Sequence, residues 1–126
     1  MSEHMVVTVC TRERPKMLMA CLRSVLPQLE AAEVQTSLVV VENDSDPKNQ
    51  EAVVALAEQF PTVRIEYRLE PELGIPFARN TAVETALELG ADWIFFIDDD
   101  EEACEGWFDA YIAAMREWNA DVFRGP

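Results

Sequence analysis

Short apolar runs alternate with amphipathic stretches of helical spacing along the whole sequence, and this alternation constrains the fold most. Continuous apolar runs predict buried strands at Val6–Cys10, Ser37–Val41 and Trp93–Ile97. Residues Val63–Leu69 alternate apolar and charged side chains, which predicts a strand with one wetter face near a sheet edge. Strands separated by helices pair in parallel through right-handed crossovers. The sequence therefore predicts an α/β fold with a Rossmann-like, mostly parallel sheet and flanking helices.

Four helices are expected between and after these strands. The first begins at Pro15, the second is stopped by Pro61, and the third runs from Gly74 to about Leu89, with Gly90 closing it. A final helix follows the last strand, and its aromatic stripe is expected to be core rather than a sugar-stacking platform. The expected buried faces are Leu18, Cys21, Leu22, Val25, Leu26 and Leu29 in the first helix, Val53, Leu56, Ala57 and Phe60 in the second, and Trp107, Phe108, Tyr111, Ile112, Met115 and Trp118 in the last.

The end of the sequence predicts the beginning of another strand at Asp121–Phe123. The chain stops at Gly125 and Pro126, just as that strand would start. At 126 residues the length allows one domain at most. We therefore expect residues 1–126 to form one portion of a longer domain.

The chain is strongly acidic, with 24 Asp and Glu against 10 Lys and Arg and a net charge of −14. Such a surface repels nucleic acid and anionic lipid, so neither is an expected partner. No apolar run approaches the ~20 residues that span a bilayer, and no signal peptide is visible at the start. The widely spaced Cys10, Cys21 and Cys104 favour reduced, buried thiols and a cytoplasmic location, with any contact to the inner face of the membrane made through parts outside this chain.

Polar side chains follow every expected strand. These segments are Thr11–Arg14, Glu42–Ser45, Glu70–Glu72 and Asp98–Glu102. In open parallel sheets, ligands bind beyond the carboxyl ends of the strands. We therefore expect the binding site at this edge of the sheet.

The run Asp98–Glu102 places five carboxylates directly after the most apolar strand. Such a cluster is tolerated when it is solvated, partly protonated or bound to a cation. Hard oxygen ligands at this density suit Mg²⁺ or Mn²⁺, which combine one or two carboxylates with the phosphates of a ligand. The alternative is an acidic first turn of a helix over Cys104–Trp118, stabilised by the helix dipole.

Arg79 lies in the first turn of the third helix, on one stripe with Val83 and Leu87. A cation at this position opposes the helix dipole and is expected to face inward, so it needs an anion. That anion is either a phosphate or nucleobase edge at the sheet edge, or a structural carboxylate such as Glu42. The residues alone leave both open.

Several common sites are not supported by the sequence. Neither a GxGxxG nor a GxxxxGK[ST] motif occurs, so dinucleotide and P-loop sites are not expected. His4 is the only histidine and is expected in a frayed terminus. Catalytic triads and histidine metal sites are therefore poor candidates.

Four segments carry a resemblance to a known family, namely Val6–Pro15, Val39–Ser45, Gly74–Asn80 and Phe95–Asp100. In this order they resemble the family-2 inverting glycosyltransferases of the GT-A fold, and among them bacterial exopolysaccharide glucosyltransferases of the succinoglycan type. Val6–Pro15 looks like the opening strand and loop of that family, and Val39–Ser45 looks like its second strand and acidic turn. Gly74–Asn80 is similar to its GxxxARN helix start, and Phe95–Asp100 to its apolar strand ending in DxD. The resemblance covers essentially the whole chain, but only the nucleotide-sugar half of such an enzyme.

The resemblance implies an inverting transfer of a hexose from a UDP-sugar to a polysaccharide or lipid-linked saccharide acceptor, assisted by Mn²⁺ or Mg²⁺. It implies that Asp98 contacts ribose, that Asp100 and Asp98 bind the metal with Asp99 in a supporting position, and that Arg79 approaches the base or the diphosphate. The residues implied to bind the nucleotide-sugar are Thr11, Arg12, Glu42, Asp44, Arg79, Asp98 and Asp99.

Two departures from the family pattern leave the nucleobase open. The first loop has Cys10, Arg12 and Glu13, and Glu42 stands where an aspartate is usual. The family's catalytic base is expected beyond Pro126, so this chain is expected to bind the donor without transferring sugar alone. The alternatives are a non-catalytic acidic metal- or partner-binding module, and a sugar nucleotidyltransferase, whose usual Gly-rich, Lys-containing first loop is missing.

Overall fold

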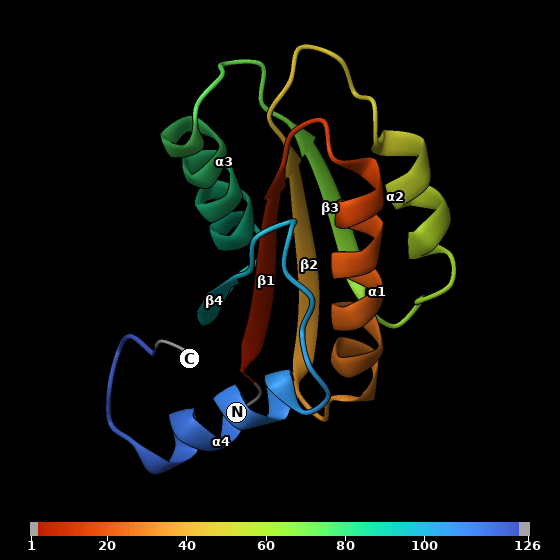
Figure 1. The fold of residues 1–126 in the computed structure, drawn as a ribbon. Coiled ribbons are helices and arrows are strands. Elements are labelled where there is room, and N and C mark those ends of the chain that lie inside the picture. The colour runs from red at the N-terminus through yellow and green to blue at the C-terminus, as the bar shows by residue number, and fades with distance from the viewer. Residues whose placement is uncertain (1–2, 124–126) are drawn as a thin grey trace.

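A computed structural model describes residues 3–123 and confirms the expected α/β class. Four parallel strands form one sheet in the order β3-β2-β1-β4, with helices on both of its faces (Figure 1). The strands are β1 (His4–Thr11), β2 (Gln35–Glu42), β3 (Arg64–Leu69) and β4 (Trp93–Phe96), and the helices are α1 (Pro15–Ala31), α2 (Gln50–Ala57), α3 (Ile75–Glu88) and α4 (Trp107–Glu117).

The sheet separates two hydrophobic cores. On one face, the alternate side chains of β1 and β2 pack against α1 and α2, and the six expected core positions of α1 are all buried. At the lower end of this face in Figure 1, α4 adds an aromatic cluster in which the ring of Phe95 lies 5.2 Å from that of Phe108 and 5.7 Å from that of Tyr111. The central strands are thus covered on both sides, as expected for continuous apolar runs.

The other face is covered by α3, which contacts the sheet through small side chains. Ala78, Ala82 and Ala86 are buried against β1 and β2. The expected inward stripe is therefore wrong: the Arg79 side chain is 57% exposed, and Leu87 also faces solvent. Alanine has a short side chain, which leaves room for the α3 backbone to lie close to β1 and β2.

The structure corrects four further expectations. His4 is buried in β1, where its Nε2 lies 2.7 Å from Ser37 Oγ, so it is not frayed. The second helix ends at Ala57 rather than at Pro61, which leaves Phe60 half-buried beyond it. Trp118 follows the end of α4 and is 63% exposed, so the aromatic stripe is only partly core. Residues 121–123 do not form a strand.

Both outer strands of the sheet are short. β3 lies at one edge, as its alternating pattern predicted, and β4 lies at the other. β4 has a partner on one side only among residues 3–123. Phe96, its last residue, is exposed despite the apolar run around it. Gly125 and Pro126, on which the expectation of a longer domain rested, lie outside the described residues. Among residues 3–123 no helix has the length and apolar character needed to cross a membrane.

Candidate functional site

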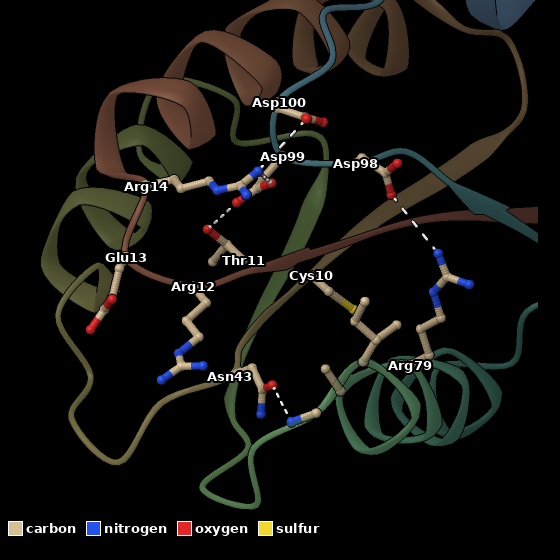
Figure 2. A pocket seen from close by; sticks show the side chains of 13 residues that line it. Cys10, Thr11, Arg12, Glu13, Arg14, Asn43, Arg79, Asp98, Asp99 and Asp100 are labelled. Atoms are coloured by element: carbon tan, nitrogen blue, oxygen red, sulfur yellow. Dashed lines mark hydrogen bonds and ion pairs between the residues drawn. The ribbon is translucent and has the colours of Figure 1, made fainter.

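A pocket of about 720 Å³ lies at the carboxyl ends of the strands, where the sequence predicted the site. Its walls come from the loop after β1, the end of β2, the start of α3 and the loop after β4 (Figure 2). The lining residues are Cys10, Thr11, Arg12, Glu13, Arg14, Asn43, Gly74, Ile75, Ala78, Arg79, Asp98, Asp99 and Asp100. Segments almost ninety residues apart in sequence meet here because parallel strands end on the same side of a sheet.

The three aspartates after β4 project in different directions (Figure 2). Asp99 is the buried member, with a side chain that is 10% exposed. Its Oδ2 accepts a hydrogen bond of 2.8 Å from Thr11 Oγ1, and its Oδ1 lies 3.4 Å from Arg14 Nη1. Asp98 and Asp100 are 66% and 51% exposed and face the open pocket. Asp99 is therefore tied to the end of β1, whereas Asp98 and Asp100 are accessible to a ligand.

Three arginines line the pocket, and two of them contact these carboxylates. Arg14 contacts both Asp99 and Asp100, the latter at 3.7 Å. Arg79 Nη2 lies 4.0 Å from Asp98 Oδ1, so the nearest anion of Arg79 is Asp98 and not Glu42. Arg12 lines the pocket and forms no ion pair with any residue in the described range. In a protein of net charge −14, this pocket concentrates three of the ten basic side chains.

Glu42 is not at the pocket surface. It is completely buried, and its carboxylate accepts hydrogen bonds from the backbone N–H and the side-chain amide of Asn49, at 2.9 and 2.7 Å, and from the hydroxyl of Tyr67. Burial and the hydrogen bond to Glu42 raise the pKa of Tyr67 above its ordinary value. The structure thus places Glu42 between β2, β3 and the start of α2, outside the residues that line the pocket.

Asp44 also lies outside the pocket lining. Its Oδ2 is 3.0 Å from Lys48 Nζ, and its Oδ1 accepts hydrogen bonds from the backbone N–H groups of Ser45 and Asp46. The contact with Lys48, together with these backbone bonds, lowers the pKa of Asp44. Lys48 also lies 3.3 Å from Glu13, so it connects the turn after β2 with the loop after β1.

Asn43 is a site residue that the sequence did not single out. Its side-chain amide donates hydrogen bonds to the carbonyl oxygens of Glu70 and Glu72, at 3.0 and 2.8 Å, and its Oδ1 accepts one of 2.9 Å from the N–H of Gly74. Gly74 adopts φ 140°, a backbone conformation that favours glycine, and begins α3. Asn43 therefore holds the loop that starts the Arg79 wall of the pocket.

A divalent cation can be held in two modes, either by protein ligands alone or by one or two carboxylates shared with a bound phosphate and water. Among residues 3–123 no three His, Cys, Asp or Glu side chains are grouped to hold a metal ion. Mg²⁺ and Mn²⁺ are commonly held by one or two carboxylates together with phosphate oxygens and water. The exposed Asp98 and Asp100 suit that second mode. The alternative of an acidic helix start is wrong, because α4 begins at Trp107, five residues after Glu102.

The cysteines are not the uniform set of buried thiols that the sequence predicted. Cys21 is buried, Cys10 is half-buried at the pocket, and Cys104 is exposed. Burial raises the pKa of Cys10 to about 11, with the Arg79 guanidinium opposing this rise and the neighbouring Asp98 carboxylate adding to it. Burial likewise raises the pKa of Cys21 to about 12. The thiols of Cys10 and Cys21 are therefore protonated at neutral pH.

Comparison with known proteins gives the same class as the fold and the pocket. The family model for glycosyl transferase family 2 matches residues 6–125. The succinoglycan biosynthesis protein ExoM of Rhizobium meliloti (strain 1021) is 28% identical over 123 residues, which are 98% of this chain and 38% of that protein. The chain also resembles the crystal structures of S. aureus TarS 1-349, alone (19% identity, covering 93% of this chain and 33% of that one) and in complex with UDP (20%, 93% and 32%), each with a TM-score of 0.71.

These matches define an α/β glycosyltransferase fold of the GT-A type. The chain belongs to glycosyl transferase family 2. It spans about a third of the length of the relatives that it matches.

Proposed function

We propose that this chain binds the nucleoside diphosphate part of a UDP-sugar in the pocket lined by Thr11, Arg12, Arg79 and the aspartates after β4. The observation that carries the proposal is the presence of three arginines beside the exposed carboxylates of Asp98 and Asp100 in one pocket at the carboxyl ends of parallel strands. A diphosphate needs cations to offset its charge, and a divalent ion bound to it needs oxygen ligands from the protein. The TarS structure in complex with UDP supports the choice of a uridine nucleotide.

The roles of the pocket residues follow from their positions. Arg12 has no competing carboxylate within ion-pair distance among the described residues, so it is the best placed of the three arginines to contact a phosphate. Asp100 and Asp98 are proposed to hold Mn²⁺ or Mg²⁺ together with the diphosphate. The bound ion would act as a Lewis acid that stabilises the charge on the leaving UDP. Asp99 binds both Thr11 and Arg14, so it keeps the loop of residues 11–14 after β1 in place.

The reaction proposed for the whole protein is the inverting transfer of a hexose to a polysaccharide or lipid-linked saccharide acceptor. Such a displacement needs a carboxylate that takes the proton from the acceptor hydroxyl. Asp98 and Asp100 are assigned to the metal, and Asp99 already accepts hydrogen bonds, so none of them is proposed as this base. The relative named for succinoglycan biosynthesis supports a polysaccharide product.

The binding proposal is tested by calorimetry with UDP, GDP and dTDP, each with and without Mn²⁺. We expect UDP to bind most tightly and Mn²⁺ to strengthen its binding. Asp100→Ala should weaken Mn²⁺-dependent UDP binding by roughly tenfold or more, as loss of a group that supports a bound metal does. Asp109→Ala, which removes an exposed carboxylate of α4, is the matched control and should leave binding unchanged.

Other outcomes would point elsewhere. Binding of no nucleotide under any condition would favour a metal- or partner-binding module and would contradict the proposal. Tighter binding of UTP than of UDP, measured in a further titration under the same conditions, would favour a nucleotidyltransferase. Unchanged affinity in Asp100→Ala would move the metal away from this carboxylate.

A further inference from the structure

The segment that presents the acidic residues to the pocket has no regular structure of its own. Residues 97–106 connect β4 with α4 and form neither helix nor strand. Asp98 and Asp100 lie in this segment. Their directions are therefore set by whatever contacts hold the segment in place.

One end of the segment is anchored to β1. The N–H of Ile97 donates to the carbonyl oxygen of Thr8 at 3.2 Å, and Asp99 accepts the hydrogen bond from Thr11. These contacts fix the segment up to Asp99. They do not reach the residues after Glu102.

The other end is anchored by one face of α1. Cys21, Ser24 and Gln28 are spaced by three and four residues, so they lie on the same side of the helix. The Cys21 thiol is 3.5 Å from the carbonyl oxygen of Asp98, so this face of α1 also contacts the β4 end of the segment. Ser24 Oγ accepts a hydrogen bond of 2.8 Å from the N–H of Ala103, directly after the acidic run, while its own proton goes to the carbonyl oxygen of Cys21.

Gln28 makes three hydrogen bonds, two of them to this part of the chain. Its Nε2 donates to the carbonyl oxygens of Cys104 and Ser24, at 2.9 and 3.1 Å, and its Oε1 accepts from the N–H of Phe108 at 2.9 Å. Phe108 is the second residue of α4, where the N–H has no partner within the helix. Since α4 has no side-chain cap of its own, Gln28 supplies one from α1.

We propose that Ser24 and Gln28 are positioning residues of the donor site. They bind the chain directly after the acidic run, at Ala103 and Cys104, whereas the Thr11–Asp99 contact binds the run itself. Together these two sets of contacts determine how Asp98 and Asp100 project into the pocket. Neither Ser24 nor Gln28 is among the residues that line the pocket, so both act through the segment that they bind. The inference rests on the proposed function and adds to it two residues outside the pocket.

The test compares Gln28→Ala and Ser24→Ala with two controls. Ser24→Thr keeps the hydroxyl, and Gln59→Ala removes an exposed glutamine side chain just beyond α2. UDP affinity with Mn²⁺ and uridine affinity are measured at a temperature at which circular dichroism shows each variant folded. Each alanine variant at these two positions should lose roughly tenfold in UDP affinity and keep uridine affinity within about twofold, because the lost hydrogen bonds act on the metal and diphosphate end of the site.

Amide hydrogen exchange and backbone NMR shifts supply a readout that does not require nucleotide. The N–H of Phe108 should exchange faster in Gln28→Ala, and that of Ala103 in Ser24→Ala, each by roughly tenfold. The amide shifts of Asp98–Asp100 should move in both variants and stay in place in Ser24→Thr and Gln59→Ala.

The possible results separate this inference from the function on which it rests. If the unmodified chain binds no UDP, the proposed function fails, and unmoved amide shifts at Asp98–Asp100 would then overturn the positioning role as well. If UDP binds, equal losses of UDP and uridine affinity, or no loss of either, would overturn the positioning role alone.

Discussion

Thr11 Oγ1 donates a hydrogen bond of 2.8 Å to Asp99 Oδ2, which joins the end of the first strand to the loop after the fourth. The two residues are 88 positions apart in sequence, and both are buried. Among residues 3–123, Arg14 is the other side chain within hydrogen-bond distance of the Asp99 carboxylate, at 3.4 Å. The contact therefore links the end of β1, which lines the pocket, to the segment that carries the exposed Asp98 and Asp100.

Replacing Thr11 by valine should remove this hydrogen bond while keeping the shape of the side chain. The buried carboxylate of Asp99 would then lack its best donor, and the free energy of unfolding should fall by about 1–3 kcal/mol. Urea denaturation measures the change. Thr11→Ser keeps the hydroxyl and should lie closer to the unmodified chain; a loss in Thr11→Ser with none in Thr11→Val would show that the methyl group, not the hydrogen bond, matters.

Replacing Tyr67 by phenylalanine should remove one of the donors to the buried Glu42. We expect a loss of about 1–3 kcal/mol in the free energy of unfolding at neutral pH, because a buried carboxylate is left less well satisfied. Tyr111→Phe is the matched control, since the Tyr111 hydroxyl makes no hydrogen bond within the described part of the chain. A similar loss in both variants would contradict the assignment.

The contact between Tyr67 and Glu42 should also make the stability of the fold fall at high pH. The pKa of Tyr67 is raised above its ordinary value of 10.0, so the folded chain keeps this proton at pH values at which the unfolded chain loses it. Its contribution is complete below pH 10 and is lost as the pH rises toward the folded pKa. Between pH 9 and 11.5, unfolding experiments should show a steeper fall in stability for the unmodified chain than for Tyr67→Phe. Parallel curves would contradict this.

Asn43 should control the loop before α3. Asn43→Ala removes all three hydrogen bonds to residues 70–74, whereas Asn43→Asp keeps only the acceptor for the N–H of Gly74. Hydrogen exchange at Gly74 should therefore accelerate in the alanine variant and remain slow in the aspartate variant. Rapid exchange in the unmodified chain would show that this contact does not hold the loop.

The three thiols should react with iodoacetamide in a definite order. The thiolate is the reactive form, and Cys10 and Cys21 have pKa values raised to about 11 and about 12. Cys104 is exposed and should be alkylated first at pH 8. Peptide mass spectrometry over time gives the order, and labelling of Cys10 ahead of Cys104 would contradict it.

The sequence by itself determined the class of fold and the position of the pocket at the carboxyl ends of the strands. Local sequence patterns predict the apolar face of α1, the parallel strands and the polar segments that follow them, because burial repeats with the period of the helix or strand. Its resemblance to family-2 glycosyltransferases was carried by four such local segments, and the family match confirms it.

Only the tertiary structure decided what each side chain contacts. Glu42 lies beneath the surface because Asn49 and Tyr67 donate hydrogen bonds to its carboxylate there. Arg79 faces outward because the side of α3 that packs against the sheet is formed by its alanines. The hydrogen bonds of Gln28 and Asn43 join residues as much as 80 positions apart. Periodicity describes a residue's own helix or strand, whereas hydrogen-bond partners come from other elements and are known only once those elements have packed together.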